Sequence, residues 1–197
     1  MNRRILIITF TFISLLSACG SKTEPQSIAD RMVESEYPAG SVQQAYAGIA
    51  GMEKVSVNGD KFLKAEGDYL NGLKHGAWVE YYNDGLVKSI TNYYEGKRQG
   101  VSIEISDRGY VEKKAYYHNN VLEGQYMEFT RNKVQELRTY VNGQMSGPKR
   151  SYYDNGNPKE ESNYVDGKIH GSAKYYRQNG ELYFEYEYDM GELVEKD

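Results

Sequence analysis

The stretch YLNGLKHGAWVEYYNDG, from Tyr69 to Gly85, decides the fold because its pattern recurs along the chain. The recurrence is marked by leading tyrosines spaced 24, 24, 23, 24 and 24 residues apart: Tyr69, Tyr93, Tyr117, Tyr140, Tyr164 and Tyr188. A fixed period of this length is typical of repeat architectures, in which each unit contacts mainly its neighbours. We therefore predict repeat units that start near residues 69, 93, 117, 140 and 164, and a partial unit at 188.

Glycines recur at fixed positions inside the units. Seven residues after the first five leading tyrosines stand Gly76, Gly100, Gly124, Gly147 and Gly171. Three residues after each leading tyrosine stands glycine, except in the third unit, which has Asn120. Asparagine is the residue next most tolerant of the left-handed region, so this position is predicted to need a positive φ. The third unit also has Asn132-Lys133 where the others have a second turn glycine, and it is one residue short.

The residue pairs at these positions indicate hairpin turns. Six pairs are of the kind that two-residue hairpin loops require: Asn71-Gly72, Asp84-Gly85, Asn142-Gly143, Asn155-Gly156, Asp166-Gly167 and Asn179-Gly180. Each unit therefore holds two strands, and alternation places Val79 and Tyr81 on one face, with Ile103 and Met127 at equivalent positions. We predict that this face is buried. The fold class is mainly β, an elongated antiparallel meander of β-hairpins with a short N-terminal helical segment.

The composition agrees with a thin sheet. The 197 residues include twenty tyrosines, twenty glycines and one cysteine, and the net charge is −4. Tyrosine rings are half polar and line a thin sheet in place of an aliphatic interior. One cysteine excludes a disulfide within the chain. An acidic chain without a basic stripe disfavours nucleic acid as a partner.

The first residues indicate export. Arg3 and Arg4 precede an apolar run from Ile5 to Leu16, which is too short to span a bilayer comfortably, so residues 1–18 are predicted to be a signal peptide. Leu16-Ser17-Ala18-Cys19 resembles the bacterial lipobox, which implies that Cys19 is the lipidated first residue of the mature chain. Gly20 after the cysteine, by resemblance to Gram-negative lipoproteins, favours the outer membrane, and we expect the protein to face the periplasm. A soluble secreted form is the alternative.

The remaining chain is predicted to divide in two. Residues 19–54 form a polar tether, a weak helical pattern from Gln26 to Glu36 and the stretch Ala39–Gly51, which is either loop or short strand. Residues 55–197 form the repeat domain, in which Val55–Tyr69 is a preceding half-unit. The short acidic end, Glu192–Asp197, is expected to blunt the last edge of the sheet. Removal of residues 1–18 changes the net charge from −4 to −6, because Arg3 and Arg4 leave with them.

Tyr69–Trp78, followed by Tyr81–Gly85, resembles the MORN-variant repeat that characterises YwqK-like antitoxins. The resemblance covers Val55–Tyr188 and implies a β-hairpin ribbon used for binding, in proteins associated with toxins. A cytoplasmic antitoxin would not carry an export signal. The resemblance and the signal together therefore favour a lipid-anchored antitoxin or immunity protein that neutralises a toxin or secreted effector by protein–protein binding.

Candidate catalytic residues are few. His75 and His170 share one repeat position but stand four units apart, which argues against a shared metal site. Glu80, Glu104 and Glu128 also share a position and are expected to form a solvated ladder rather than an acid pair. We therefore predict no enzymatic activity, no metal and no cofactor. A hydrolase that uses the glutamate ladder is the least favoured alternative.

The aromatic residues are the candidate binding residues. The leading tyrosines are expected to stack as structural ladders. A second set is predicted to form an exposed surface on the opposite face: Trp78, Tyr82, Tyr94, Tyr126, Tyr153 and Tyr175. Rigid amphipathic rings are favoured in protein-binding surfaces, which points to a protein toxin or effector as the partner. Such rings also suit sugars, so the alternative is an envelope scaffold or adaptor lipoprotein that binds glycan or phospholipid. A further alternative is that the N-terminal segment covers this face.

Overall fold

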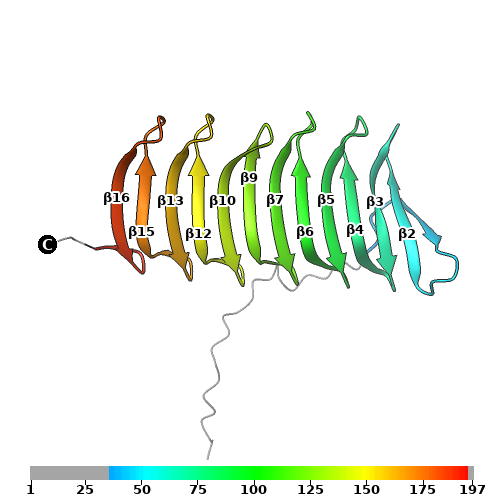
Figure 1. Ribbon diagram of the computed structural model, residues 1–197. Coiled ribbons are helices and arrows are strands. Elements are labelled where there is room, and N and C mark those ends of the chain that lie inside the picture. The colour runs from blue at the N-terminus through cyan, green and yellow to red at the C-terminus, as the bar shows by residue number, and fades with distance from the viewer. Residues whose placement is uncertain (1–35, 195–197) are drawn as a thin grey trace, which may run out of the picture.

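A computed structural model describes residues 36–194, which form a single-layer antiparallel sheet (Figure 1). Each long strand between the two edges pairs with the long strands before and after it in the chain, so the sheet is a long meander of hairpins. The predicted fold class is confirmed for these residues. The signal peptide, Cys19 and nearly all of the predicted helical segment lie outside them.

Seventeen strands make up the described sheet, and twelve of them are long. The long strands are β2 (Met52–Asn58), β3 (Leu63–Leu70), β4 (Leu73–Tyr81), β5 (Val87–Tyr94), β6 (Lys97–Ile105), β7 (Val111–His118), β9 (Gly124–Thr130), β10 (Lys133–Val141), β12 (Gly147–Tyr152), β13 (Pro158–Val165), β15 (Gly171–Tyr176) and β16 (Leu182–Asp189). Four short strands each pair with the strand before them: β8 (Val121–Leu122), β11 (Gln144–Met145), β14 (Lys168–Ile169) and β17 (Glu192–Leu193). The stretch Ala39–Gly51 contains β1 (Ser41–Ala45), which pairs with β2 at the edge.

The turns follow the residues that stand in them. Asn71 and Gly72 both have positive φ, 53° and 79°, as a two-residue turn of this kind requires. Asn120 has a φ of 72°, which confirms the predicted left-handed requirement at its position. The third unit turns at Arg131 and Asn132, both with positive φ, and this tighter turn accounts for its missing residue.

Half of the predicted two-residue turns are longer loops, so that prediction is wrong for them. In the loop around Asp84, the Tyr82 N–H donates to the Leu86 carbonyl at 2.8 Å and the Gly85 N–H donates to the Tyr82 carbonyl at 3.0 Å. Gly85 has positive φ and Asp84 does not. The loops at Asn155-Gly156 and Asn179-Gly180 have the same hydrogen bonds. A three-residue loop that ends on a left-handed glycine is the next most common hairpin connection.

The glycine seven residues after each of the first five leading tyrosines lies in a β-bulge. Between β3 and β4, Gly67 pairs with Trp78 and Asp68 pairs with His75, so Gly76 and its neighbour are inserted on one strand only. All five glycines at this position have positive φ. Because two residues are inserted, alternation along β4 continues across the bulge, and Trp78 and Val79 face opposite sides of the sheet.

The buried residues lie on the face that carries the leading tyrosines, which we call the tyrosine face. They are Val55, Ala65, Tyr69, Trp78, Ala115 and Ala173. The prediction that Val79 and its equivalents are buried is wrong: Val79, Ile103 and Met127 lie on the other face and are half-exposed. The tyrosine face is covered at its start by the chain before β1, where the Tyr37 ring stacks on Tyr69 at a centroid distance of 4.8 Å.

Candidate functional site

Two cations lie among the rings at the N-terminal part of the tyrosine face. Lys74 pairs in register with Tyr69, and its Nζ lies 4.5 Å from the centre of the Trp78 ring and 4.8 Å from that of Tyr93. The Arg98 guanidinium lies 4.1 Å from the centre of the Tyr117 ring. A cation over an aromatic face is attracted by the quadrupole of the ring. The faces of these rings are therefore partly covered by the protein itself.

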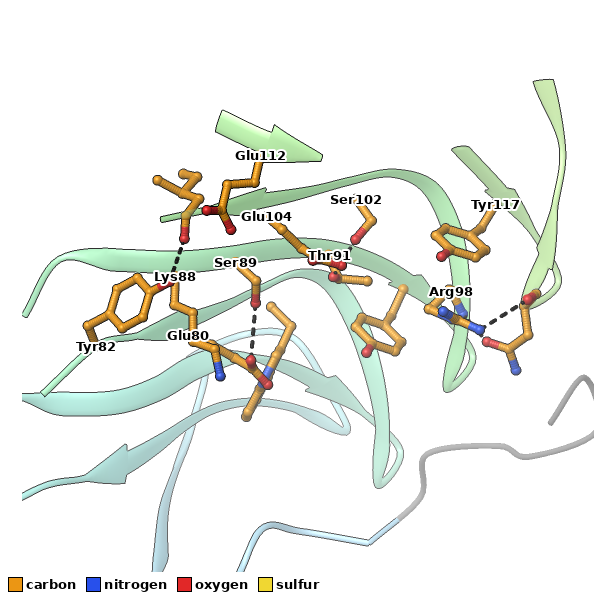
Figure 2. A pocket seen from close by; sticks show the side chains of 14 residues that line it. Glu80, Tyr82, Lys88, Ser89, Thr91, Arg98, Ser102, Glu104, Glu112 and Tyr117 are labelled. Atoms are coloured by element: carbon orange, nitrogen blue, oxygen red, sulfur yellow. Dashed lines mark hydrogen bonds between the residues drawn. The ribbon is translucent and has the colours of Figure 1, made fainter. Parts of the chain in front are cut away.

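Next to these rings, small residues leave a hollow of about 690 Å³ on the tyrosine face. Trp78 pairs with Thr91, Thr91 with Ser102, and Ser102 with Ala115. The next side chain along this row is the ring of Tyr126 on β9, two residues before Glu128. The small side chains of this row that line the hollow are Thr91 and Ser102, next to the large Trp78 ring, and they make a depression in a sheet that is one layer thick. Figure 2 shows the residues that line it.

The floor of the hollow is made of hydroxyl groups (Figure 2). The Thr91 Oγ1 and the Ser102 Oγ are 2.8 Å apart and share a hydrogen bond. The Ser89 Oγ donates to the Glu80 Oε2 at 3.1 Å. Each hydroxyl can both donate and accept. The floor can therefore form hydrogen bonds with both donor and acceptor groups of a bound ligand.

One end of the hollow is rich in carboxylates. Glu80, Glu104 and Glu112 line it together with Lys88 and Tyr82. The Lys113 Nζ donates to both oxygens of Glu104, at 2.9 and 3.0 Å. Among residues 36–194, the side chains of Lys88 and Glu112 form neither a hydrogen bond nor an ion pair. These two charged groups are available to a ligand.

The Tyr82 hydroxyl lies near several carboxylates at that end. Its pKa is raised above 10 first by loss of solvent and then by nearby carboxylates, of which Glu112 contributes most and Asp107 next. Carboxylates disfavour the phenolate because it carries the same charge. Three carboxylates and one lysine line this end of the hollow, so carboxylates predominate there.

The predicted glutamate ladder lies on the tyrosine face, and its members have different partners. Glu80 accepts from Ser89, Glu104 is paired with Lys113, and Glu128 accepts from the Tyr126 hydroxyl at 3.1 Å. Burial and the Glu128 carboxylate raise the pKa of Tyr126 to about 12. No two of the three act as a mutual carboxyl pair in these contacts. The ladder is a row of separate interactions.

The six predicted binding rings do not form one surface, so that geometric prediction is wrong. Trp78, Tyr126 and Tyr175 lie on the tyrosine face, and the exposed side chain of Tyr94 lies on the other face, 5.5 Å from the His75 ring. Trp78 is only 4% exposed. The hydroxyls of Tyr82 and Tyr153 donate to main-chain oxygens of Ile105 and Tyr176, each at 2.8 Å. The six occupy four different repeat positions, and alternation and bulges therefore separate them.

The sequence interpretation missed the floor of the hollow. Ser102 stands nine residues after a leading tyrosine, where the neighbouring units have Trp78 and Tyr126. That substitution of a small residue for a large ring is the signal that could have located the hollow. Thr91, Ser89 and Glu112 carry no comparable signal in the sequence.

The residues that the structure describes offer neither a metal centre nor a membrane span. No group of three or more His, Cys, Asp and Glu side chains in residues 36–194 is placed to hold a metal ion. Within the same residues there is no helix of the length and apolar character needed to cross a bilayer.

The fold and its period define the class: a β-hairpin repeat protein with an open hollow on one face. The family described as MORN repeat variant matches the chain at residues 74–93, 145–166 and 169–190, so the chain contains MORN-variant repeats at these positions. The matched ranges fall in the first, fourth and fifth units, whereas the hollow extends from the first unit through the second to the third. Comparison with curated proteins gives no match.

Proposed function

We propose that this protein is a non-enzymatic binding protein of the cell envelope that neutralises a protein toxin or secreted effector by holding a segment of it on the tyrosine face. The observation that supports this most is the open hollow of about 690 Å³ lined by Trp78, Ser102 and Tyr117. Clefts of this size with a few convergent polar groups are common binding sites. The resemblance of the repeat to YwqK-like antitoxins supports the toxin as the partner.

The chemistry of the hollow favours a polypeptide over a sugar. A sugar ring binds well against an open aromatic face, but Lys74 lies over Trp78 and Tyr93, and Arg98 lies over Tyr117. What remains accessible is a floor of hydroxyl groups and a row of carboxylates. Hydroxyl groups suit the alternating donors and acceptors of a peptide backbone.

The charge at the hollow favours a basic partner segment. The unpaired Glu112 and the neighbouring carboxylates Glu80 and Glu104 attract Lys or Arg side chains. Complementary charge of this kind raises the association rate and makes it salt-dependent. The net charge of −6 that remains after removal of residues 1–18 acts in the same direction.

The proposal includes an anchor at Cys19. Acylation there would hold the protein at the outer membrane, facing the periplasm, where an incoming toxin arrives. Acyl chains contribute about 0.8 kcal/mol for each buried methylene, so two or more chains hold a protein firmly. Cys19→Ser tests this part alone: the variant is expected to leave the membrane fraction while its affinity for the toxin stays unchanged.

The experiment uses a strain that lacks the gene and is exposed to secreted effectors encoded beside it. The strain is expected to lose viability with one effector and to recover with the wild-type gene. Ser102→Tyr fills the hollow and should abolish the rescue. Gln125→Tyr places the same ring on the opposite face, where Gln125 is exposed, and should rescue fully.

Two outcomes would overturn the proposed function. The first is unchanged survival of the deletion strain against every such effector. The second is binding of purified peptidoglycan or of lipid vesicles that Ser102→Tyr removes and Gln125→Tyr leaves intact, since this would assign the hollow to an envelope scaffold instead.

A further inference from the structure

The last long strand of the described sheet, β16, has an open outer edge. On its inner side it pairs with β15 along its length. On its outer side only Tyr188 and Asp189 pair with β17, and the Val194 N–H donates to the Glu187 carbonyl at 2.8 Å. From Leu182 to Tyr186 the outer edge has no strand beside it among residues 36–194. Figure 1 shows β16 at the end of the row.

The same edge one unit earlier is occupied. β13 is the repeat equivalent of β16, and its outer side pairs with β15 through Glu160 with Tyr175 and Glu161 with Lys174. The His170 N–H donates to the Asn163 carbonyl at 2.9 Å, which corresponds to the bond from Val194 to Glu187. The edge of β16 therefore offers the register that β13 offers to β15.

The main chain of Glu185 points outward on this edge. The Glu187 carbonyl accepts a hydrogen bond on the outer side. In an antiparallel strand the N–H and C=O of one residue point to one side and those of the next residue to the other, so residues two apart point to the same side. The N–H and C=O of Glu185 are thus directed away from β15. These are the groups that an added strand would pair with.

The side chains of β16 define the strand that fits. On the tyrosine face, Phe184 is 44% and Tyr186 is 38% exposed, with their rings stacked at 5.7 Å. On the other face stands Glu185, with the Lys174 Nζ 3.9 Å away on the inner side. Its equivalent Glu161 has a basic neighbour on both sides: Arg150 at 3.7 Å and Lys174 in register. Glu185 has one.

We propose that the outer edge of β16 binds an extended strand of a protein partner by antiparallel β pairing. The partner strand carries a basic residue opposite Glu185 and an apolar or aromatic residue beside Phe184. Opposite charges placed directly across two strands stabilise the pair, and like charges destabilise it. A second copy of β16 would bring its own Glu185 and Glu187 to this edge, so charge disfavours it as the occupant. This surface is separate from the hollow and is tested separately.

The probe is a labelled peptide with the sequence of residues 168–177, KIHGSAKYYR, which is the strand that pairs with the equivalent edge inside the chain. Fluorescence anisotropy with the full-length protein in detergent is expected to show saturable binding. Lys174→Pro in the peptide removes the N–H that pairs with Glu185, and Lys174→Glu reverses the charge. Each is expected to weaken binding about tenfold or more.

A charge exchange gives the matched control. Glu185→Lys in the protein should weaken binding of the unchanged peptide and restore binding of the Lys174→Glu peptide. Gln44→Lys on β1, at the opposite edge of the sheet, should change neither. Circular dichroism establishes that the protein variants are folded, and the peptide variants test the pairing even if one of them is not.

Three results would overturn the proposal. They are the absence of saturable peptide binding, equal binding of the proline peptide, and a dimeric mass in light scattering that Glu185→Lys abolishes. The last result would assign the edge to a second copy. Toxin protection that depends on Ser102 is unaffected by any of them, so the two proposals fail independently.

Discussion

The two ends of the ribbon are built from the same repeat and differ in how much they bury. At the N-terminal end, Val55 and Tyr69 are fully buried and Trp78 is almost so. At the C-terminal end, every residue of β16 except Tyr188 is exposed. Both ends carry aromatic residues on the tyrosine face, so ring content alone does not account for the difference.

The difference lies in what covers each end. Tyr69 is contacted by the Tyr37 ring at 4.8 Å and the Trp78 ring at 5.8 Å, and its hydroxyl donates to the Glu36 carbonyl at 3.2 Å. Glu36 and Tyr37 precede the repeats. Tyr188 is the repeat equivalent of Tyr69 and meets only the two-residue β17 on its outer side. In repeat arrays, terminal caps supply the cover that internal units obtain from their neighbours.

The strongest test of this comparison is truncation of one ring at each end. Trp78→Ala is expected to cost about 3–5 kcal/mol of unfolding free energy, because a large side chain leaves a filled site. Phe184→Ala is expected to cost less than about 1 kcal/mol, because the Phe184 side chain is largely exposed. Urea unfolding followed by far-UV circular dichroism measures both. Equal losses would show that both ends are equally well covered.

A smaller effect is expected from filling the space under Trp78. Gly67 pairs with Trp78, and a Cβ on Gly67 would overlap the tryptophan ring and lie 2.9 Å from the Ala77 carbonyl oxygen. Gly67→Ala is therefore expected to destabilise the protein by about 1–3 kcal/mol. Thr91 is the repeat equivalent of Gly67 and faces the hollow, so Thr91→Ala is the matched control with a smaller loss. Thermal melts of the two variants give the comparison, and the same melting temperature for both would contradict it.

The smallest effect concerns a hydrogen bond that both ends share. The Tyr81 hydroxyl donates to Glu66 at 2.6 Å, and the Tyr176 hydroxyl donates to Glu161 at 2.8 Å. Tyr81→Phe and Tyr176→Phe are each expected to cost about 1 kcal/mol, as removal of one hydrogen bond does. Similar losses of unfolding free energy at the two ends, measured by urea unfolding at pH 7, would show that the ends differ in how well they are covered and not in this hydrogen bond. A loss at one end only would contradict this.

The same bond predicts a pH dependence at the N-terminal end. The hydrogen bond from Tyr81, followed by that from Lys54, lowers the pKa of Glu66 below 4.5, and Glu66 in turn raises the pKa of Tyr81 to about 12. A depressed carboxyl pKa adds stability above its ordinary value, which is lost as the pH falls through the folded-state pKa. A raised tyrosine pKa adds stability that is lost as the pH rises through about 12. The difference in unfolding free energy between wild type and Tyr81→Phe should therefore become smaller in acid and at very high pH. A difference that stays constant from pH 3 to pH 7 would show that the ionised Glu66 carboxylate is not the acceptor of this hydrogen bond.

The period and the turn glycines are enough to predict the meander, because each turn depends on residues that stand in it. Asn120 and the short third unit show this, since both departures from the pattern have a local backbone reason. The buried face could not be predicted, because alternation places Trp78 on one face of β4 and Val79 with Tyr81 on the other, so both faces carry large side chains. Burial of Tyr69 depends on Tyr37, which lies outside the repeat and carries no periodic signal. The hollow depends on small side chains such as Thr91 and Ser102, and only Ser102 stands visibly apart from the rings that occupy its repeat position in neighbouring units.

The single tryptophan of the chain gives the hollow its own optical signal. Trp78 is the only indole in the sequence, and it lines the hollow while being almost completely buried. Its emission wavelength and its quenching by iodide depend on the polarity and accessibility of that one place. Occupation of the hollow can therefore be followed on the unlabelled wild-type protein. A strand added at β16, which is separated from β4 by eight long strands of the meander, would leave the emission unchanged.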